Sequence, residues 1–141
     1  MAKACYRKLH DYKYQLMDDY VIQIDIRPER DIDFIFVSLS SGGLLTIRKA
    51  YAWDGPSGPS IDTKNFMRGS LVHDALYQLM RLSALNYLVH RQRADGLLRE
   101  ICLADGMSSF RAWYVYQAVH WFAEGGVRPR NEPEVEIICV P

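Results

Sequence analysis

The chain has 141 residues, with 17 basic and 17 acidic side chains and no formal net charge. This length fits one domain over residues 1–141 that buries its own core. The charge balance argues against broad electrostatic attraction to nucleic acid or an anionic membrane, so we expect no nucleic-acid partner.

The cysteines and the hydropathy of the chain argue against several further classes of protein. Cys5, Cys102 and Cys139 are odd in number and form no CxxC pair, so the sequence predicts neither a zinc site nor a disulfide scaffold. The N-terminus lacks the apolar run of a signal peptide, and no stretch reaches the roughly 18 apolar residues of a membrane span. We therefore expect a cytoplasmic protein with reduced thiols and no transmembrane segment.

The first part of the chain, residues 1–51, predicts an antiparallel β meander. The expected strands cover residues 12–17, 20–26, 33–39 and 44–51. In the second of these, Ile22, Ile24 and Ile26 alternate with polar or exposed positions, which is typical of a half-buried strand. The Ser-Ser-Gly-Gly run at 40–43 predicts a turn between the last two strands.

After a Gly/Pro loop at 52–62, apolar residues recur at helical spacing instead of alternating. Residues 63–124 therefore predict three helices. The first is capped by Asp62 or Thr63, the second runs from about 86 to 104, and the third from 110 to about 123. An extended tail covers 125–141. Strands followed by helices predict an α+β fold. The family resemblance described below implies in addition that the first two helices are antiparallel.

Aromatic residues recur along the third predicted helix. They are Phe110, Trp113, Tyr114, Trp121 and Phe122. Aromatic side chains bury the most area per residue, so this stripe is expected in the core. An alternative is that part of it forms an apolar groove for an acyl chain or a partner.

The loop at 52–62 and the first helix together hold oxygen ligands and a candidate base. Gly55 and its neighbouring prolines can turn carbonyls inward, and Ca²⁺ takes about six to eight oxygens, carbonyls and carboxylates among them. Asp74 supplies a carboxylate. Asp54 and Asp62 are further carboxylates, although aspartate also favours turns and helix caps.

His73 is a candidate general base for water, and Asp95 on the second helix can fix its tautomer. A bound metal would polarise a substrate carbonyl. A structural interpretation fits the same pattern, with His73 buried against Asp95 and Asp74 bonded to loop N–H groups. His90 and His120 are expected at the surface or core edge, without a role.

This constellation resembles secreted phospholipase A2, which has a glycine-rich calcium loop, a His-Asp-x-x-Tyr helix and an antiparallel helix with an orienting aspartate. Gly55 and Ser57 stand 19 and 17 residues before Asp74, as that family's loop carbonyls do, and Trp53 stands at a third such position. The resemblance implies the following roles: His73 as base, Asp95 as orienting acid, Tyr77 as supporting hydroxyl, and Asp74 with the carbonyls of Trp53, Gly55 and Ser57 as calcium ligands.

Over nearly its whole length the chain resembles the DUF1353 family, which is common in tailed phages and prophages. The matching segments are Asp54-Gly-Pro-Ser57-Gly-Pro59, His73-Asp74-Ala-Leu-Tyr77 and Ala94-Asp95. This resemblance implies a phage context and no particular substrate.

The sequence thus predicts a phage-associated, calcium-dependent hydrolase of phospholipase A2 type that acts on a lipid or another carboxylic ester. The alternative is a non-catalytic accessory, virion or host-interaction protein in which the same residues are structural. The expected location is the host cytoplasm, with virion association as the alternative.

Overall fold

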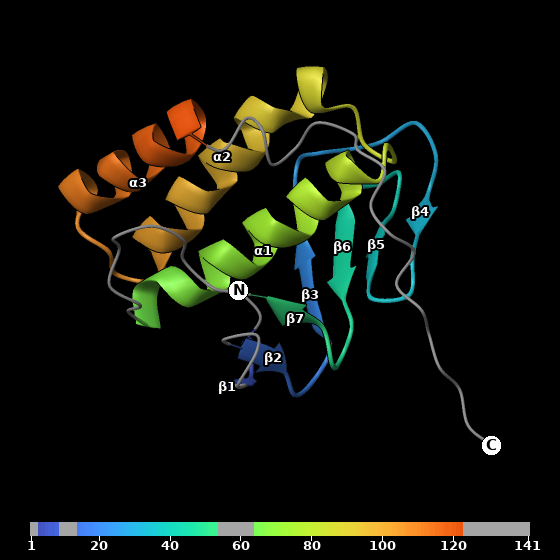
Figure 1. Ribbon diagram of the computed structural model, residues 1–141, viewed down its shortest axis with the longest axis horizontal. Coiled ribbons are helices and arrows are strands. Elements are labelled where there is room, and N and C mark those ends of the chain that lie inside the picture. The colour runs from blue at the N-terminus through green and yellow to red at the C-terminus, as the bar shows by residue number, and fades with distance from the viewer. Residues whose placement is uncertain (1–2, 9–13, 54–63, 123–141) are drawn as a thin grey trace.

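Two small sheets and three helices make up the computed structural model, which describes residues 3–8, 14–53 and 64–122 (Figure 1). The helices are α1 (Lys64–Arg81), α2 (Tyr87–Ala104) and α3 (Ser109–Phe122). In the described part every strand precedes every helix, which confirms the predicted α+β class. Most of the Gly/Pro loop, the expected cap at Asp62 or Thr63, and the tail lie outside the described residues.

The strands form two antiparallel sheets. One sheet has the order β1-β2-β7, and the other has the order β3-β6-β5-β4. The strands of the first sheet are β1 (Tyr6–Lys8), β2 (Tyr14–Leu16) and β7 (Ala52–Trp53). Those of the second are β3 (Tyr20–Gln23), β4 (Ile32–Asp33), β5 (Val37–Leu39) and β6 (Leu44–Ile47).

The pairing is antiparallel as predicted, but it is not one simple meander. In the four-stranded sheet, only β4, β5 and β6 follow each other in space as in sequence, while β3 pairs with β6, with Tyr20 opposite Ile47. The single strand expected over 33–39 is wrong, because a turn divides it and Phe34 N donates to Val37 O at 3.0 Å. Side chains 34–36 in that turn are all exposed.

The turn at 40–43 is confirmed and depends on a glycine. Gly43 has φ +89°, donates from its N–H to Ser40 O, and accepts from Ile24 N. A Cβ at Gly43 would lie 2.3 Å from Ile24 O, so no other residue fits there. The alternation along the neighbouring strand is also confirmed, since Ile22, Ile24 and Ile26 are buried.

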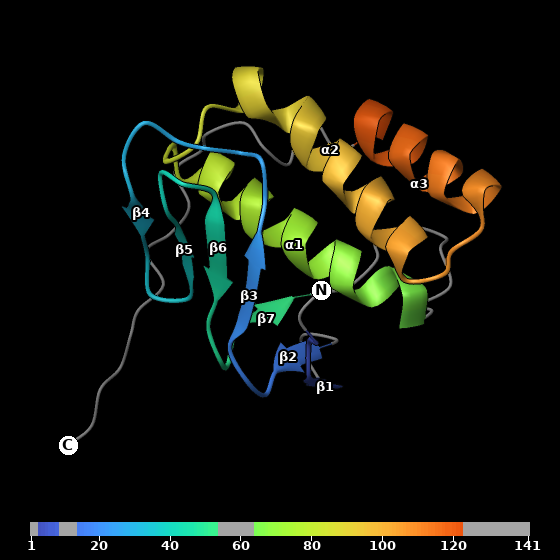
Figure 2. The ribbon, with the colours of Figure 1, turned by 180° about the vertical axis from the view of Figure 1, so that it is seen from behind.

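Helix α1 is the central layer of the molecule. It crosses one face of the four-stranded sheet, and α2 packs between α1 and α3 (Figures 1 and 2). Six of its side chains have no exposed area, and they are Leu71, Val72, Ala75, Leu76, Leu79 and Met80. A helix that is apolar on most sides is one that is covered on most sides. Of the polar side chains on α1, Ser70 and His73 are buried, whereas Asp74 is partly exposed.

The ends of α2 and α3 agree with the sequence. Asn86 Oδ1 accepts from Leu88 N at 2.9 Å and caps α2, and Gly106 follows it with φ +96°. Ser108 Oγ accepts from Arg111 N at 3.3 Å at the start of α3. These caps satisfy backbone groups that the helix itself leaves unpaired.

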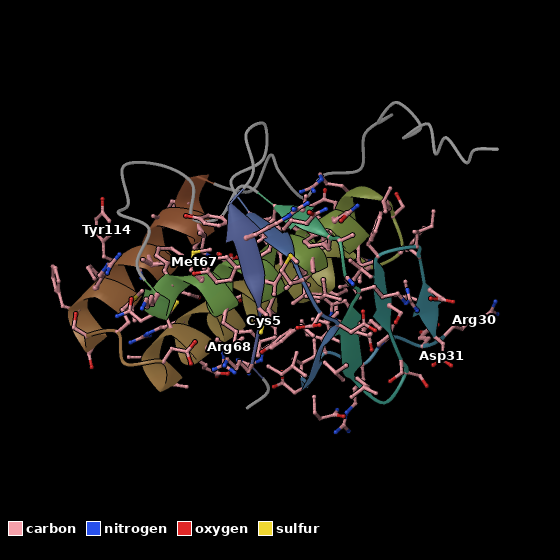
Figure 3. The ribbon with its side chains drawn as sticks, turned by 90° about the horizontal axis from the view of Figure 1, so that it is seen from below. Cys5, Arg30, Asp31, Met67, Arg68 and Tyr114 are labelled. Carbon is pink, nitrogen blue, oxygen red and sulfur yellow. The ribbon has the colours of Figure 1, made fainter. Side chains whose placement is uncertain are left out.

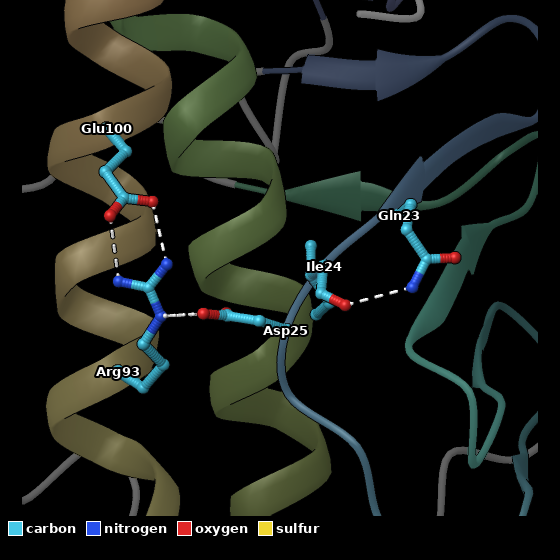
Figure 4. A network of polar contacts seen from close by, with 5 residues as sticks. All are labelled: Gln23, Ile24, Asp25, Arg93 and Glu100. Carbon is cyan, nitrogen blue, oxygen red and sulfur yellow. Dashed lines mark hydrogen bonds and ion pairs between the residues drawn. The ribbon is translucent and has the colours of Figure 1, made fainter.

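Arg93 joins α2 to the end of β3. Its Nε donates to Asp25 Oδ1 at 2.8 Å, and its Nη1 donates to Glu100 Oε1 at 2.9 Å (Figure 4). In the same view Gln23 Nε2 donates to Ile24 O at 3.1 Å. The hydrogen bonds that Arg93 donates to Glu100 and Asp25 raise the pKa of Arg93 above its ordinary value.

The aromatic stripe expected in the core is mostly exposed, so that prediction is wrong. Phe110 and Trp121 are 75% and 70% exposed, and Trp113 and Tyr114 are also exposed; the side chain of Phe122 lies outside the described part. Because α3 packs mainly against α2, two small residues are buried there instead, Ala112 and Val115. None of the described helices is both long and apolar enough to cross a membrane.

Candidate functional site

Helix α1 carries three of the predicted site residues within two turns. His73 and Tyr77 are buried, and their rings lie one turn apart with centroids 4.0 Å from each other. Asp74 is rotated by about 100° around the helix from His73 and keeps 35% of its side chain exposed. The helix therefore directs the two aromatic rings inward and the carboxylate toward its edge.

Helix α2 supplies the fourth residue, Asp95, whose side chain has no exposed area. His73 Nε2 lies 2.8 Å from Asp95 Oδ1, and the Tyr77 hydroxyl donates to the same oxygen. This contact forms because α1 and α2 run antiparallel, as the sequence predicts, so that residues from the middle of each helix face one another. The structure thus brings together His73, Tyr77 and Asp95.

The second ring nitrogen of His73 lies on the side of Asp74. His73 Nδ1 and Asp74 Oδ1 are 3.8 Å apart. When Nε2 carries the proton donated to Asp95, the lone pair of the neutral ring is on Nδ1, toward the partly exposed side of the site. This is the tautomer that a general base with an orienting carboxylate requires.

Two opposing effects set the pKa of His73. Burial disfavours the charged ring, but the hydrogen bonds and negative charges of Asp74 and Asp95 outweigh burial and raise the pKa above its ordinary value. Burial and the hydrogen bond to Asp95 also raise the pKa of Tyr77, so its hydroxyl stays protonated and remains a donor.

His120, which the sequence predicts at the surface or core edge without a role, is the next member of this cluster. Its Nδ1 lies 3.9 Å from Asp95 Oδ2, the carboxylate oxygen that His73 does not contact. The Arg91 side chain donates to the backbone carbonyl of His120. No local motif surrounds His120, and only the packing of α3 on α2 brings it here.

The calcium ligands expected from the loop are only partly within the described residues. Gly55 and Ser57 lie outside them, as do Asp54 and Asp62. The buried Trp53 donates from Nε1 to Ser70 Oγ at 3.2 Å, which holds the end of β7 against α1 one turn before Asp74.

Within the described ranges, no group of three or more His, Cys, Asp or Glu side chains is arranged to hold a metal ion. A cation site at Asp74 would therefore need further oxygen donors. Carboxylate and backbone carbonyl oxygens are the chemistry that Ca²⁺ favours.

A pocket of about 380 Å³ opens beside the first turns of α1. Its lining includes Lys3, Tyr6, Trp53, Lys64, Met67 and Arg68, but not His73. Figure 3 shows Met67 and Arg68 on α1. Met67 is seven residues, or two turns, before Asp74, so these two residues lie on the same face of α1, but Asp74 does not line the pocket.

These features define an α+β protein with a buried His-Asp-Tyr cluster between two antiparallel helices. The model of the family described as a protein of unknown function, DUF1353, matches residues 44–119, more than half of the chain and the part that contains this cluster. The chain belongs to the DUF1353 family, which confirms the predicted resemblance. Comparison with curated proteins and with solved structures found no match.

Proposed function

We propose that this protein is a phage-associated, calcium-dependent hydrolase of phospholipase A2 type that cleaves a carboxylic ester, with His73 as the general base. The observation that carries the proposal is the environment of the His73 ring. Its Nε2 contacts the buried Asp95 at 2.8 Å, and its Nδ1 lies toward the partly exposed Asp74. One nitrogen is therefore anchored while the other is on the side where solvent reaches the site.

In this mechanism His73 Nδ1 accepts a proton from a water molecule as the water oxygen attacks the ester carbonyl carbon. The ring then carries a positive charge, which Asp95 stabilises through Nε2. When the tetrahedral intermediate collapses, His73 returns the proton to the leaving alkoxide, so the ring is neutral again. Tyr77 donates to Asp95 throughout and keeps the carboxylate oriented.

Asp74 would hold the calcium ion together with the carbonyls of Trp53, Gly55 and Ser57. When bound, the ion supplies positive charge that polarises the ester carbonyl. It would also offset the charge of Asp74 beside His73, which favours the neutral ring that a base needs.

The central test measures hydrolysis of dispersed phospholipid and of a short-chain aryl ester in the presence of calcium. We expect His73→Ala to lower the rate by about 100-fold or more, the usual contribution of a general base. His90→Ala is the matched control, because His90 lies on α2 outside the cluster and should keep the wild-type rate. Equal rates for His73→Ala and wild type would contradict the proposal.

Calcium binding has its own test. An ion that binds only the native protein raises the midpoint of thermal unfolding as its concentration rises. We expect this rise in wild type and in the exposed control Asp18→Asn, and we expect Asp74→Asn to abolish it. No rise in wild type would contradict the calcium part of the proposal.

A structural role is the second candidate, and the burial of His73 between two carboxylates favours it. In that case the cluster ties α1 to α2 in a non-catalytic accessory, virion or host-interaction protein. It predicts no hydrolysis and no response to calcium, while His73→Ala still lowers the unfolding midpoint. Mass spectrometry of purified virions and of infected-cell extracts would then separate virion protein from an intracellular one.

A further inference from the structure

Only one of the two oxygens of the Asp95 carboxylate has hydrogen-bond partners among the described residues. Its Oδ1 accepts from His73 and Tyr77, whereas Oδ2 is buried and has no hydrogen-bond partner among the described residues. A buried carboxylate oxygen without a donor is rare, because burial removes the water that would otherwise bind it. We therefore expect a neighbouring group to donate a hydrogen bond to this oxygen.

His120 is a candidate donor from the neighbouring helix α3. Its Nδ1 is also buried without a partner and lies 3.9 Å from Asp95 Oδ2, so a shift of about 1 Å gives a hydrogen bond of ordinary length. The two unsatisfied atoms are thus a complementary pair across the α2–α3 interface.

The surroundings of His120 hold its ring in position. Its backbone carbonyl accepts from Arg91 of α2, and its ring stacks on Tyr116 with centroids 5.7 Å apart and planes at 10°. Trp121 packs against the ring edge-on at 5.5 Å. These contacts hold the backbone and one ring face of His120 next to Asp95.

We propose that His120 is a second histidine of this site, a positioning residue whose Nδ1–H donates to Asp95 Oδ2 and so fixes the carboxylate that orients His73. A carboxylate bound at one oxygen can rotate about its Cβ–Cγ bond, and one bound at both oxygens cannot. Helix α3 thereby becomes part of the site. The hydrogen bond stands on the geometry alone, whereas its effect on hydrolysis rests on the proposed function.

Imidazole nitrogen spectra test the hydrogen bond without any enzyme assay. In ¹⁵N-histidine-labelled protein, long-range ¹H–¹⁵N correlations report which nitrogen of each ring carries the proton. We expect His120 to be protonated at Nδ1 and His73 at Nε2. A neutral His120 protonated only at Nε2 would overturn the proposal, and this measurement needs no variant.

Variants then test the coupling to His73. His120→Ala should shift the Nε2 and Hε2 resonances of His73, and His120→Asn should restore them, because an asparagine amide can place a donor where Nδ1 lies. His120→Gln places its amide where Nε2 lies and should not restore them. His90→Asn is the matched control and should leave His73 unchanged. His73 resonances that are identical in wild type and His120→Ala would overturn the proposal.

Kinetics separates this inference from the proposed function. His120 does not contact substrate, so His120→Ala should lower kcat by about 10-fold with KM unchanged, and His120→Asn should recover most of kcat. Hydrolysis that depends on His73 but not on His120 would overturn this inference and leave the proposed function intact. Coupled His73 and His120 spectra without any hydrolysis would contradict the proposed function alone.

Discussion

Gly69 of α1 lies so close to Leu98 of α2 that a Cβ at Gly69 would be 3.0 Å from Leu98 Cδ1 and 3.2 Å from Leu98 O. The same Cβ would be 2.9 Å from Cys102 Sγ. The two helices therefore approach each other where one of them has no side chain. This close crossing lies one turn before His73 and helps to set its distance from Asp95.

The crossing predicts that Gly69→Ala destabilises the protein. Overpacking costs about 1–3 kcal/mol, which exceeds the gain of up to about 1 kcal/mol from the better helix propensity of alanine. We expect a net loss of about 1 kcal/mol in the free energy of unfolding, measured in urea. Gly96→Ala is the control, because a Cβ there meets only the flexible end of Arg93, at 3.2 Å, and should stabilise α2. Equal effects of the two substitutions would contradict this account.

Asp95→Ala should lower the free energy of unfolding more than Gly69→Ala does. It leaves His73 and Tyr77 buried without their acceptor, and removal of one partner from a buried charged contact costs about 3–5 kcal/mol. Asp25→Ala removes the carboxylate from an ion pair with Arg93. Because Asp25 is exposed, we expect this substitution to lower the free energy of unfolding by about 1 kcal/mol or less. Chemical denaturation of both variants measures these losses. A loss of unfolding free energy for Asp95→Ala no larger than for Asp25→Ala would refute the prediction.

The raised pKa of His73 gives a pH dependence with a definite sign. A group whose pKa is higher in the folded protein binds its proton more tightly there, so its contribution to stability is complete below the ordinary histidine pKa of about 6.5. That contribution is lost as pH rises through the raised folded value. The unfolding free energy of wild type, measured relative to His73→Gln, should therefore fall as pH rises through this window.

His90 provides a control of opposite sign for the same experiment. Burial lowers the pKa of His90, so its contribution is present above the ordinary pKa and is lost as pH falls through the lowered folded value. The difference between wild type and His90→Gln should therefore rise with pH. Matching slopes for the two histidines would show that the charges of Asp74 and Asp95 do not govern His73.

Because the aromatic stripe of α3 is exposed, substitutions in it should change the free energy of unfolding only slightly, although the sequence pattern there resembles a core. Phe110→Ala should change the unfolding free energy by about 0.5 kcal/mol or less, because the side chain is 75% exposed. Val115→Ala should cost about 2 kcal/mol, because the smaller Val115 is buried against α2. Thermal or urea unfolding checks both, and a larger loss at Phe110 would mean that the residue is covered in solution.

Local signals in the sequence were sufficient wherever neighbouring residues decide the structure. Gly106 marks the end of α2 and Ser108 the start of α3, because caps bind backbone groups within a few residues. Ile22 and Ile24 mark the buried face of a strand because side chains alternate along it. His73, Asp74 and Tyr77 were identified in the same way, since their spacing on one helix is fixed.

Other features depend on which surfaces meet, and the sequence did not predict them. The aromatics of α3 resemble a core stripe, but α2 covers only the side with Ala112 and Val115. The apolar run at 33–39 resembles a strand, but it contains a turn. Periodicity shows that a surface is apolar without showing what covers it.

The sequence by itself determined the α+β class, the ends of α2, the start of α3, the family and the His-Asp-Tyr spacing, because these depend on short-range backbone geometry or on residue order. Only the tertiary structure decided that His73 and Tyr77 share one oxygen of Asp95 and that His120 faces the other. Those contacts join residues 18 to 25 positions apart on three helices, and the packing of the helices, Gly69 included, sets their distances.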